Sequence, residues 1–282
     1  MRLERELLIP IVERALEEDL GRAGDLTGDA VVPVAARGEA VIVARQSLIL
    51  AGIPLAREVY RAIDPELRFS AAHEDGSRVD RDTVVARVAG STRALVRGER
   101  TALNFLMRMS GIATATRAAV DEIDGTSARI LDTRKTAPGL RLLDKYAVRC
   151  GGGLNHRMGL YDAVLIKDTH LGAGCTVGQA VRRALDAGHP AAIVTAEVRG
   201  LDQLEQAIEA GVGRVLLDNM PLEMMAEAVR RAERRVVIEA SGGLRPGHLR
   251  SVAETGVDFL SLGWLTHSAP AADLAMEIRE PR

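Results

Sequence analysis

Between residues 129 and 263 the sequence repeats one arrangement, a short apolar run followed by a longer amphipathic segment. The apolar runs are RILD, AVLIK, AIVTAEV, RVLLD, RVVIEA and DFLSL, and the segments between them include LDQLEQAIEAG and LEMMAEAVRRAERR. Strands that alternate with helices run parallel, because each helix returns the chain to the same edge of the sheet. Such a sheet is either open and doubly wound or curved into a barrel. The repeat therefore restricts this part of the chain to the α/β class.

Polar residues and glycines follow nearly every one of these apolar runs. They are Arg134, Lys135, Lys167, Asp168, Glu197, Asp218, Asn219, Glu239, Ser241, Ser261 and Gly263. In a barrel the carboxyl ends of all strands converge on one mouth, so residues far apart in sequence meet there. This placement favours a barrel over a doubly wound sheet and predicts the active site at its mouth.

The chain before this repeat follows a different pattern. It opens with a helical stretch, MRLERELLIPIVERALEEDL, and continues with strand-like runs such as EAVIVARQSLIL and TVVARVAG that turn sequences separate. Apolar residues spaced three and four apart predict one helix over residues 101–123, which joins this part to the repeat. The sequence therefore predicts a small α+β layer structure ahead of the barrel.

Composition excludes several kinds of partner. The formal net charge is -2 and aromatic residues make up 2% of the chain, so neither a dominant basic surface nor a base-stacking platform is expected. The amino terminus mixes acids into its amphipathic pattern, unlike a secretory leader, and no segment reaches membrane-spanning length. We expect a cytoplasmic protein with a small anionic ligand, and neither a nucleic-acid nor a membrane partner.

Positive charge is concentrated in TRKTAPGLRLLDKYAVRCGGGLNHR, residues 133–157, where the single acid is Asp144. Three of the cations fit the solvated face of a helix: Arg141, Lys145 and Arg149. Four other residues flank a strand end and a glycine turn: Arg134, Lys135, His156 and Arg157. An unpaired positive charge in a partly desolvated barrel mouth costs several kcal/mol of free energy, so we expect a negatively charged ligand there. Because arginine forks match carboxylates, the pattern predicts a substrate with more than one acidic group.

Two further features of the predicted mouth suit a phosphorylated ligand. Gly242 and Gly243 lie between a strand and a predicted helix start, where backbone N–H groups and the helix dipole favour phosphate, although a plain turn also fits. Glu197 and Asp218 end neighbouring predicted strands. They either neutralise the cations in salt bridges or hold Mg²⁺ together with phosphate oxygens.

Long stretches of the chain resemble the quinolinate phosphoribosyltransferases, also called carboxylating nicotinate-nucleotide pyrophosphorylases. The longest is TRKTAPGLRLLDKYAVRCGGGLNHRMGLYDAVLIKD, and the others are EDLGRAGDLT, GERTALNFL, VLLDNM, IEASGG and VDFLSLGWLTHS. The resemblance implies an incomplete, open α/β barrel over residues 108–265. It also implies an N-terminal α/β sandwich over residues 1–107, to which the C-terminal segment of residues 266–282 also belongs. A homodimer is implied as well, in which the partner completes each barrel mouth.

The resemblance implies phosphoribosyl transfer from phosphoribosyl pyrophosphate to quinolinate with decarboxylation. The products would be nicotinate mononucleotide, pyrophosphate and CO₂ in de novo NAD biosynthesis, which makes the chain a pentosyltransferase that requires Mg²⁺. The alternatives are a Schiff-base sugar-phosphate lyase that uses Lys167, a non-catalytic anion sensor, and a molybdenum-associated family with the same TRKT and glycine-triplet pattern.

Matching motifs also imply roles for single residues. The quinolinate carboxylates would contact Arg134, His156 and Arg157, with Arg100 contributed by the partner subunit. Glu197 and Asp218 would bind Mg²⁺ and the ribose, and with Lys135 and Lys167 they form the implied catalytic set. The remaining substrate-binding residues are Ser241, Gly242, Gly243, Ser261 and Gly263, of which the glycine loops and Ser241 would hold the 5′-phosphate.

Two positions depart from the family pattern. Thr169 stands where members commonly have Asn in KDNH, and Thr195 stands where they often have an acid. Neither departure removes a matched charge, so we expect activity to survive.

Overall fold

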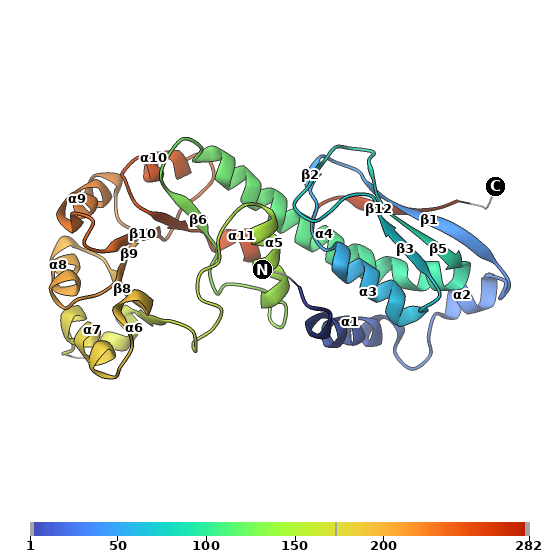
Figure 1. The fold of residues 1–282 in the computed structure, drawn as a ribbon, viewed down its shortest axis with the longest axis horizontal. Helices are drawn as coiled ribbons and strands as arrows, with labels where there is room; N and C mark the ends of the chain where they lie inside the picture. The colour runs from blue at the N-terminus through green and yellow to red at the C-terminus, as the bar shows by residue number, and fades with distance from the viewer. Residues whose placement is uncertain (1–2, 173, 280–282) are drawn as a thin grey trace. The chain divides into compact units, whose positions relative to one another are not determined.

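The computed structural model describes residues 3–172 and 174–279, which form two compact units (Figure 1). The first unit comprises Met1–Arg117, Ala137–Gly152 and Ser268–Arg282, and the second comprises Ala118–Thr136 and Gly153–His267. This division places Ala137–Gly152 with the first unit, whereas the predicted boundary assigned these residues to the barrel. None of the described helices is long and apolar enough to cross a membrane.

The second unit is built on one parallel sheet. Its strands are β6 (Arg129–Leu131), β7 (Val164–Ile166), β8 (Val194–Val198), β9 (Arg214–Asp218), β10 (Val237–Ser241) and β11 (Phe259–Ser261). Their order across the sheet is β6-β11-β10-β9-β8-β7. Although β6 and β7 are consecutive in the chain, they form the two edges, so the barrel is open between them. The six predicted strands and the open barrel are confirmed.

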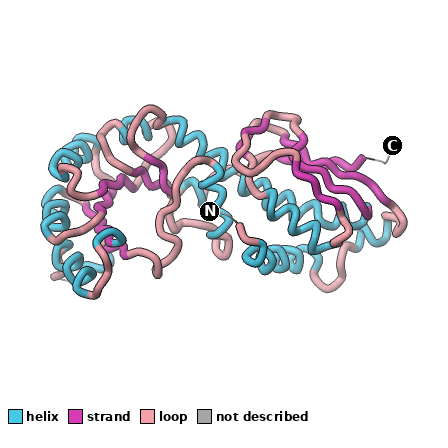
Figure 2. Tube along the Cα trace, viewed as in Figure 1, coloured by secondary structure: helices cyan, strands magenta, loops and turns pink. Residues whose placement is uncertain are grey.

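Helices lie outside the curved sheet of this unit, as Figure 2 shows. These outer helices are α7 (Val177–Asp186), α8 (Leu201–Glu209), α9 (Leu222–Ala232) and α10 (Leu249–Ala253). Two one-turn helices, α6 (Asp168–Leu171) and α11 (Trp264–His267), follow β7 and β11, and a short 3₁₀ turn lies at Ala191–Ile193. A capping box starts α7, because Thr176 accepts from the Gln179 N–H at 3.2 Å and Gln179 accepts from the Thr176 N–H at 3.1 Å. The amphipathic segments of the sequence therefore form the outer layer of the barrel.

The first unit contains a four-stranded antiparallel sheet of order β12-β1-β5-β3. Its strands are β1 (Arg37–Ala44), β3 (Arg68–Ala71), β5 (Val84–Ser91) and β12 (Leu274–Arg279), and a separate small pair is formed by β2 (Leu48–Ile49) and β4 (Arg78–Val79). Residues Ala40–Ala44 of β1 are all buried. The end of the described chain pairs with β1, so this sheet joins segments from both ends of the sequence.

The helices of the first unit are α1 (Arg5–Leu20), α2 (Leu26–Val31), α3 (Ile53–Ile63), α4 (Thr92–Glu122) and α5 (Arg141–Cys150), and α4 continues past the division between the units. Helix α4 begins nine residues before the predicted start at residue 101, because its apolar face continues back through Leu95 and Ala94, which are buried. Gly98 lies in this added part, where a Cβ atom would come within 2.7 Å of the Tyr60 ring. Close packing against α3 therefore explains the glycine.

Helix α5 corrects one expectation about the cation-rich segment. Lys145 is 1% exposed, whereas the sequence pattern placed it on a solvated face. It lies among Leu143, Ala147 and Val148, which are also buried. The spacing of charged residues along a helix predicts a solvent-exposed face. It does not reveal that a charged residue of this helix is buried as well as its apolar residues. The expectation is wrong for Lys145, while Arg149 is exposed.

Candidate functional site

A cavity of 330 Å³ lies at the carboxyl ends of the parallel strands. Eleven of the predicted site residues line it: Arg134, Lys135, His156, Arg157, Lys167, Glu197, Asp218, Ser241, Gly242, Gly243 and Ser261. Gly263 is adjacent, since a Cβ atom there would lie 2.9 Å from Cδ of Lys135. Arg100 belongs to α4 in the first unit, where its side chain is exposed, and it is not among the lining residues. The structure therefore brings together residues that span 128 positions of sequence, from Arg134 to Ser261.

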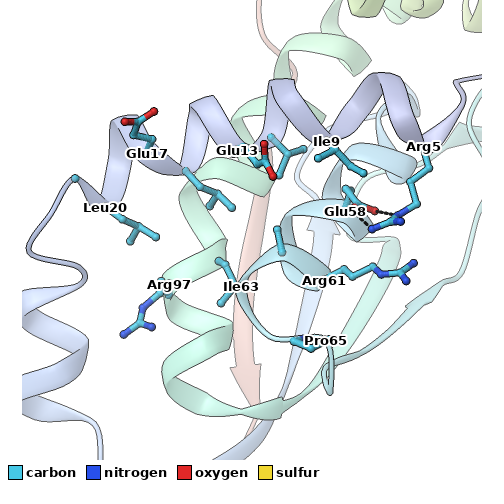
Figure 3. Close-up of a pocket in the computed structure, with 14 residues that line it drawn as sticks. Arg5, Ile9, Glu13, Glu17, Leu20, Glu58, Arg61, Ile63, Pro65 and Arg97 are labelled. Carbon is cyan, nitrogen blue, oxygen red and sulfur yellow. Dashed lines mark hydrogen bonds and ion pairs between the residues drawn. The ribbon is translucent and has the colours of Figure 1, made fainter.

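Another cavity, of 690 Å³, lies between α1 and α3 in the first unit, and Figure 3 shows its lining. Its wall includes an ion pair in which Nε and Nη2 of Arg5 each lie 2.9 Å from a carboxylate oxygen of Glu58. Glu13 and Glu17 add two more acids to this cavity. The three acids of this lining balance its three arginines, Arg5, Arg61 and Arg97. The smaller cavity in the barrel has four Lys or Arg side chains and a histidine against three acids, so it is the better candidate for an anionic ligand.

Strand alternation and register explain how the barrel residues meet. Every second residue of a strand faces the same side of the sheet. In the parallel register Ser241 pairs with both Asp218 and Ser261, so these three side chains lie at one level across β9, β10 and β11. Glu197 and Glu239 each pair with Leu216, which places them one level lower. The sheet therefore presents two successive layers of polar side chains to the cavity.

The cations enter the site on both sides of the opening between β6 and β7. Leu154 forms a parallel bridge with Leu131, which extends the edge of β6 and carries the following residues, His156 and Arg157, to the cavity. Asp132, which is fully buried, accepts the His156 backbone N–H at 2.8 Å. The sequence analysis missed this anchoring role of Asp132, although an acid directly after the apolar run RIL was a visible signal.

Arg157 lies in an unfavourable position for a positive charge. Its Nη1 donates to the Ala163 carbonyl at 3.0 Å, which fixes the guanidinium beside the cavity. Burial, together with the positive charge of Arg134, holds the pKa of Arg157 below its ordinary value. Two guanidinium groups that repel each other in a partly buried site favour an anionic ligand between them.

The two predicted metal ligands both have cationic partners in this structure. The Lys167 Nζ atom lies 3.4 Å from a carboxylate oxygen of Glu197, whose side chain is 10% exposed. Asp218 accepts from Arg199 Nε at 3.2 Å, and its side chain is 17% exposed. The salt bridges weighed as one alternative are therefore present.

The same two carboxylates fit a magnesium ion that a substrate phosphate also binds. Both line the cavity on neighbouring strands, and Mg²⁺ commonly takes one or two protein carboxylates and completes its shell with water and phosphate oxygens. Within residues 3–172 and 174–279, no three His, Cys, Asp or Glu side chains cluster as a metal site. The residues thus suit a metal that arrives with a phosphorylated substrate better than a permanently chelated one.

The glycine loop after β10 has a backbone that requires glycine. Gly242 and Gly243 have φ values of 89° and 63°, and a Cβ atom on Gly242 would lie 2.5 Å from side-chain atoms of Asn219. Helix α10 begins only at Leu249 and has five residues. The helix-dipole part of the phosphate prediction is therefore wrong, because residues 244–248 form a turn between the glycines and the helix.

Glu239 is a buried acid at the base of the cavity. Its carboxylate accepts from the Ser261 hydroxyl, lies 3.4 Å from His156 Nε2, and accepts from Arg214 Nη1 at 3.2 Å. Burial opposes its ionisation, but the hydrogen bonds from His156 and Ser261 and the charge of Arg214 outweigh this effect and keep its pKa below the ordinary value. The sequence places Glu239 among the polar residues expected at the mouth, and the structure adds its contacts with His156, Ser261 and Arg214.

Both departures from the family pattern are visible here. Thr195 is buried on β8, two residues before Glu197 on the same face of the strand. Thr169 is exposed, and its backbone N–H donates to Asp168 Oδ1 at 2.7 Å. Neither residue is among those that line the cavity.

Comparison with known proteins gives consistent results across the chain. The model of the quinolinate phosphoribosyl transferase C-terminal domain matches residues 112–277, and that of the N-terminal domain matches residues 25–110. A probable carboxylating nicotinate-nucleotide pyrophosphorylase of Synechocystis sp. is 41% identical over 276 residues, which cover 96% of this chain and 92% of the relative. One of Bacillus subtilis is 39% identical over 261 residues, which cover 93% of this chain and 90% of the relative.

Solved structures agree with these matches. The nicotinate-nucleotide pyrophosphorylase of Francisella tularensis superposes with a TM-score of 0.93 at 36% identity, covering 99% of this chain and 98% of that one. The enzyme of Ehrlichia chaffeensis gives a TM-score of 0.93 at 33% identity, covering 99% of this chain and 100% of that one. Sequence, fold and site geometry together show that this chain belongs to the quinolinate phosphoribosyltransferase family.

Proposed function

We propose that the protein transfers the phosphoribosyl group of phosphoribosyl pyrophosphate to quinolinate and decarboxylates the product. The reaction would give nicotinate mononucleotide, pyrophosphate and CO₂. The observation that carries this proposal is one cavity in which Arg134, His156 and Arg157 lie together with Glu197 and Asp218. Relatives that the chain matches over more than nine tenths of its length bear the name of this activity.

Quinolinate suits the cationic part of the cavity. Its two carboxylates would accept charge-assisted hydrogen bonds from Arg134 and Arg157, each worth about 1.5 to 3 kcal/mol. Such a dianion would also offset the repulsion that lowers the pKa of Arg157. The same contacts would orient the pyridine nitrogen toward the sugar, so binding and alignment would come from the same groups.

Phosphoribosyl pyrophosphate suits the part of the cavity that the glycine loop and the two carboxylates form. Ser241, Gly242 and Gly243 would hold the 5′-phosphate with hydroxyl and backbone donors, supported by the neighbouring Gly263. Glu197 and Asp218 would hold Mg²⁺ and the ribose hydroxyls. When bound, the ion would neutralise charge on the pyrophosphate.

The chemistry needs positioned charges and no enzyme nucleophile. As the bond between the anomeric carbon and pyrophosphate breaks, positive charge develops on the ribose, which Glu197 and Asp218 would stabilise. Lys135 and Lys167 would stabilise the negative charge on the leaving group. The pyridine nitrogen attacks the anomeric carbon and becomes cationic. The adjacent carboxylate then leaves as CO₂, its bonding electron pair stays on the ring carbon beside the cationic nitrogen, and a proton takes its place.

Arg100 would contact quinolinate from a partner subunit in a homodimer. Its exposed position on α4 in the first unit is compatible with this role. The cytoplasmic location stays a prediction, since two plant relatives are named as a chloroplastic and a mitochondrial protein.

The lyase alternative is less favoured by the geometry. Schiff-base formation needs a lysine whose nitrogen is free to attack a carbonyl, whereas Lys167 Nζ lies 3.4 Å from a carboxylate oxygen of Glu197 in an ion pair. The names of the relatives likewise favour the carboxylating enzymes over the molybdenum-associated family.

The decisive experiment supplies purified protein with quinolinate labelled in the carboxylate next to nitrogen, phosphoribosyl pyrophosphate and Mg²⁺. We expect labelled CO₂ and nicotinate mononucleotide in equal amounts, and neither product from the Arg134→Ala variant. If the native protein binds either substrate but forms neither product, the proposed function is wrong. Trapping of a sugar phosphate by borohydride would support the lyase instead.

A further inference from the structure

The interior of the barrel beneath the cavity carries a column of charge. Barrel interiors are usually filled by branched apolar side chains. Here Arg214 Nη1 lies 3.2 Å from one oxygen of Glu239, and His156 Nε2 lies 3.4 Å from the other. In the strand register Arg214 pairs with Val237, one level below Glu239, and Ser261 lies one level above it. The column therefore runs along the strands from Arg214 to the floor of the cavity.

Stability alone does not explain this column. The Glu239 side chain has no exposed surface, and burying such a charge costs several kcal/mol that an ion pair often fails to recover. Arg214 compensates from below, where its guanidinium carbon lies 4.8 Å from the centre of the Phe259 ring. An apolar core of similar volume would satisfy the packing equally well, so the charged groups point to a role at the cavity.

The hydrogen bonds of His156 distinguish its two ring nitrogens. The Arg157 backbone N–H donates to His156 Nδ1 at 2.7 Å, so this nitrogen is the acceptor and the proton lies on Nε2. Nε2 faces the Glu239 carboxylate, and the His156 side chain is 10% exposed. The ring is therefore held from two sides while it forms part of the cavity wall.

We propose that Glu239 is a positioning residue that acts through His156, with Arg214 as its counter-charge. The Arg157 backbone N–H fixes the tautomer of the imidazole, and Glu239 holds the ring in the orientation that the quinolinate side of the cavity requires. The substrate named here rests on the proposed function, whereas the coupling between Glu239 and His156 does not. The Glu239 carboxylate bonds to Ser261, His156 and Arg214, none of which belongs to the loop of Gly242 and Gly243, so we expect the phosphoribosyl side to depend on it less.

The test compares Glu239→Gln, which keeps the size of the side chain and removes its charge, with Glu223→Gln on the exposed surface of α9. We expect Glu239→Gln to raise KM for quinolinate about tenfold, since the charged acceptor that His156 faces becomes a neutral one, and to change KM for phosphoribosyl pyrophosphate less than about twofold. In NMR spectra the His156 Nε2–H resonance should keep its position and its slow exchange in the native protein and in Glu223→Gln, and should shift upfield and exchange faster in Glu239→Gln, because its charged acceptor is lost.

A double-mutant cycle separates positioning from a general structural effect. When His156 is already replaced by Ala, adding Glu239→Gln should change KM for quinolinate less than about twofold. Glu239 acts on quinolinate binding by orienting the His156 ring, which that background lacks. If Glu239→Gln does not fold, the double variant Arg214→Met with Glu239→Gln removes both charges of the pair and takes its place.

Three results would overturn the proposal: an unchanged His156 Nε2–H resonance in Glu239→Gln, an unchanged KM for quinolinate, or an equal effect with and without the His156 ring. If the native protein makes no nicotinate mononucleotide, the proposed function fails, but the NMR comparison still decides whether Glu239 orients His156.

Discussion

Asp144, whose side chain has no exposed surface, receives two hydrogen bonds from Arg108, at 2.9 Å from Nε and 2.8 Å from Nη2. The backbone N–H of Ala137 adds a third at 3.0 Å. The single acid of the cation-rich segment therefore joins α5 to α4, and a second hydrogen bond of α5, from Tyr146 to Asp75 at 2.9 Å, holds this helix to the first unit. These bonds explain why Ala137–Gly152 belongs to that unit.

Replacing Arg108 with Ala should destabilise the protein strongly. The change leaves a fully buried carboxylate without its charged partner, which costs about 3 to 5 kcal/mol. Urea unfolding would measure the loss in the free energy of unfolding. Arg22→Ala, an exposed change in the same unit, should stay within about 0.5 kcal/mol of the native value. If Arg108→Ala and Arg22→Ala had similar free energies of unfolding, the ion pair between Arg108 and Asp144 would be contradicted.

Gly242→Ala should weaken the binding of phosphoribosyl pyrophosphate. A Cβ atom at this position would lie 2.5 Å from the Asn219 side chain, so the loop must shift. Gly247→Ala is a matched control, because Gly247 has a similar φ of 86° but nothing within 4 Å of its added Cβ. Both variants should lose about 1 kcal/mol of stability from the backbone. Only Gly242→Ala should raise KM for phosphoribosyl pyrophosphate, and equal KM values would refute the role of this close contact.

Mixing two inactive variants tests the proposed role of Arg100. Arg100→Ala and Lys135→Ala should each be inactive as homodimers. A hybrid dimer would contain one complete site, so random subunit exchange should restore about a quarter of the native activity. Native mass spectrometry would verify the exchange. No recovery in a sample with hybrid dimers would exclude a site shared between subunits.

Glu197→Gln should raise the Mg²⁺ concentration needed for half-maximal activity. The amide oxygen is a weaker ligand than a carboxylate, and we expect an increase of about 10- to 100-fold, comparable with other losses at metal sites. Activity measured against Mg²⁺ at saturating substrates gives this number. The exposed change Glu223→Gln should leave the requirement unaltered. If Glu197→Gln also leaves it unaltered, Glu197 does not hold the metal.

Acid should remove the stability that Glu239 contributes. Its pKa is lower in the folded protein than in the unfolded chain, because the hydrogen bonds from His156 and Ser261 and the charge of Arg214 outweigh the opposing effect of burial. The contribution is therefore fully present above the unfolded pKa of about 4.3 and is lost as pH falls through the lower folded value. Tm measured from neutral pH downward should show the difference between the native protein and Glu239→Gln shrinking below about pH 4. A difference that grows in acid would contradict this assignment.

The strands could be predicted because apolar runs and amphipathic segments alternate without interruption, and their polar ends identified most of the cavity. Partners far apart in sequence could not be predicted. The carboxylate of Glu239 depends on Arg214 and His156, whose positions beside it follow from strand register, and register is not visible in one sequence. Lys145 was placed in solvent for a related reason, since helical periodicity marks an apolar face but not a second covered one.

Because the barrel is open between β6 and β7, four of the residues that would contact the acid ligand lie outside the paired strands. Residues 132–163 connect the edge strands β6 and β7, which do not pair with each other among the described residues. Arg134, Lys135, His156 and Arg157 all lie on this connection. None of these four residues pairs with a strand, although Leu154 of the same connection bridges to Leu131. Mutations at the four positions are therefore where a scaffold of this kind would acquire affinity for a different acid.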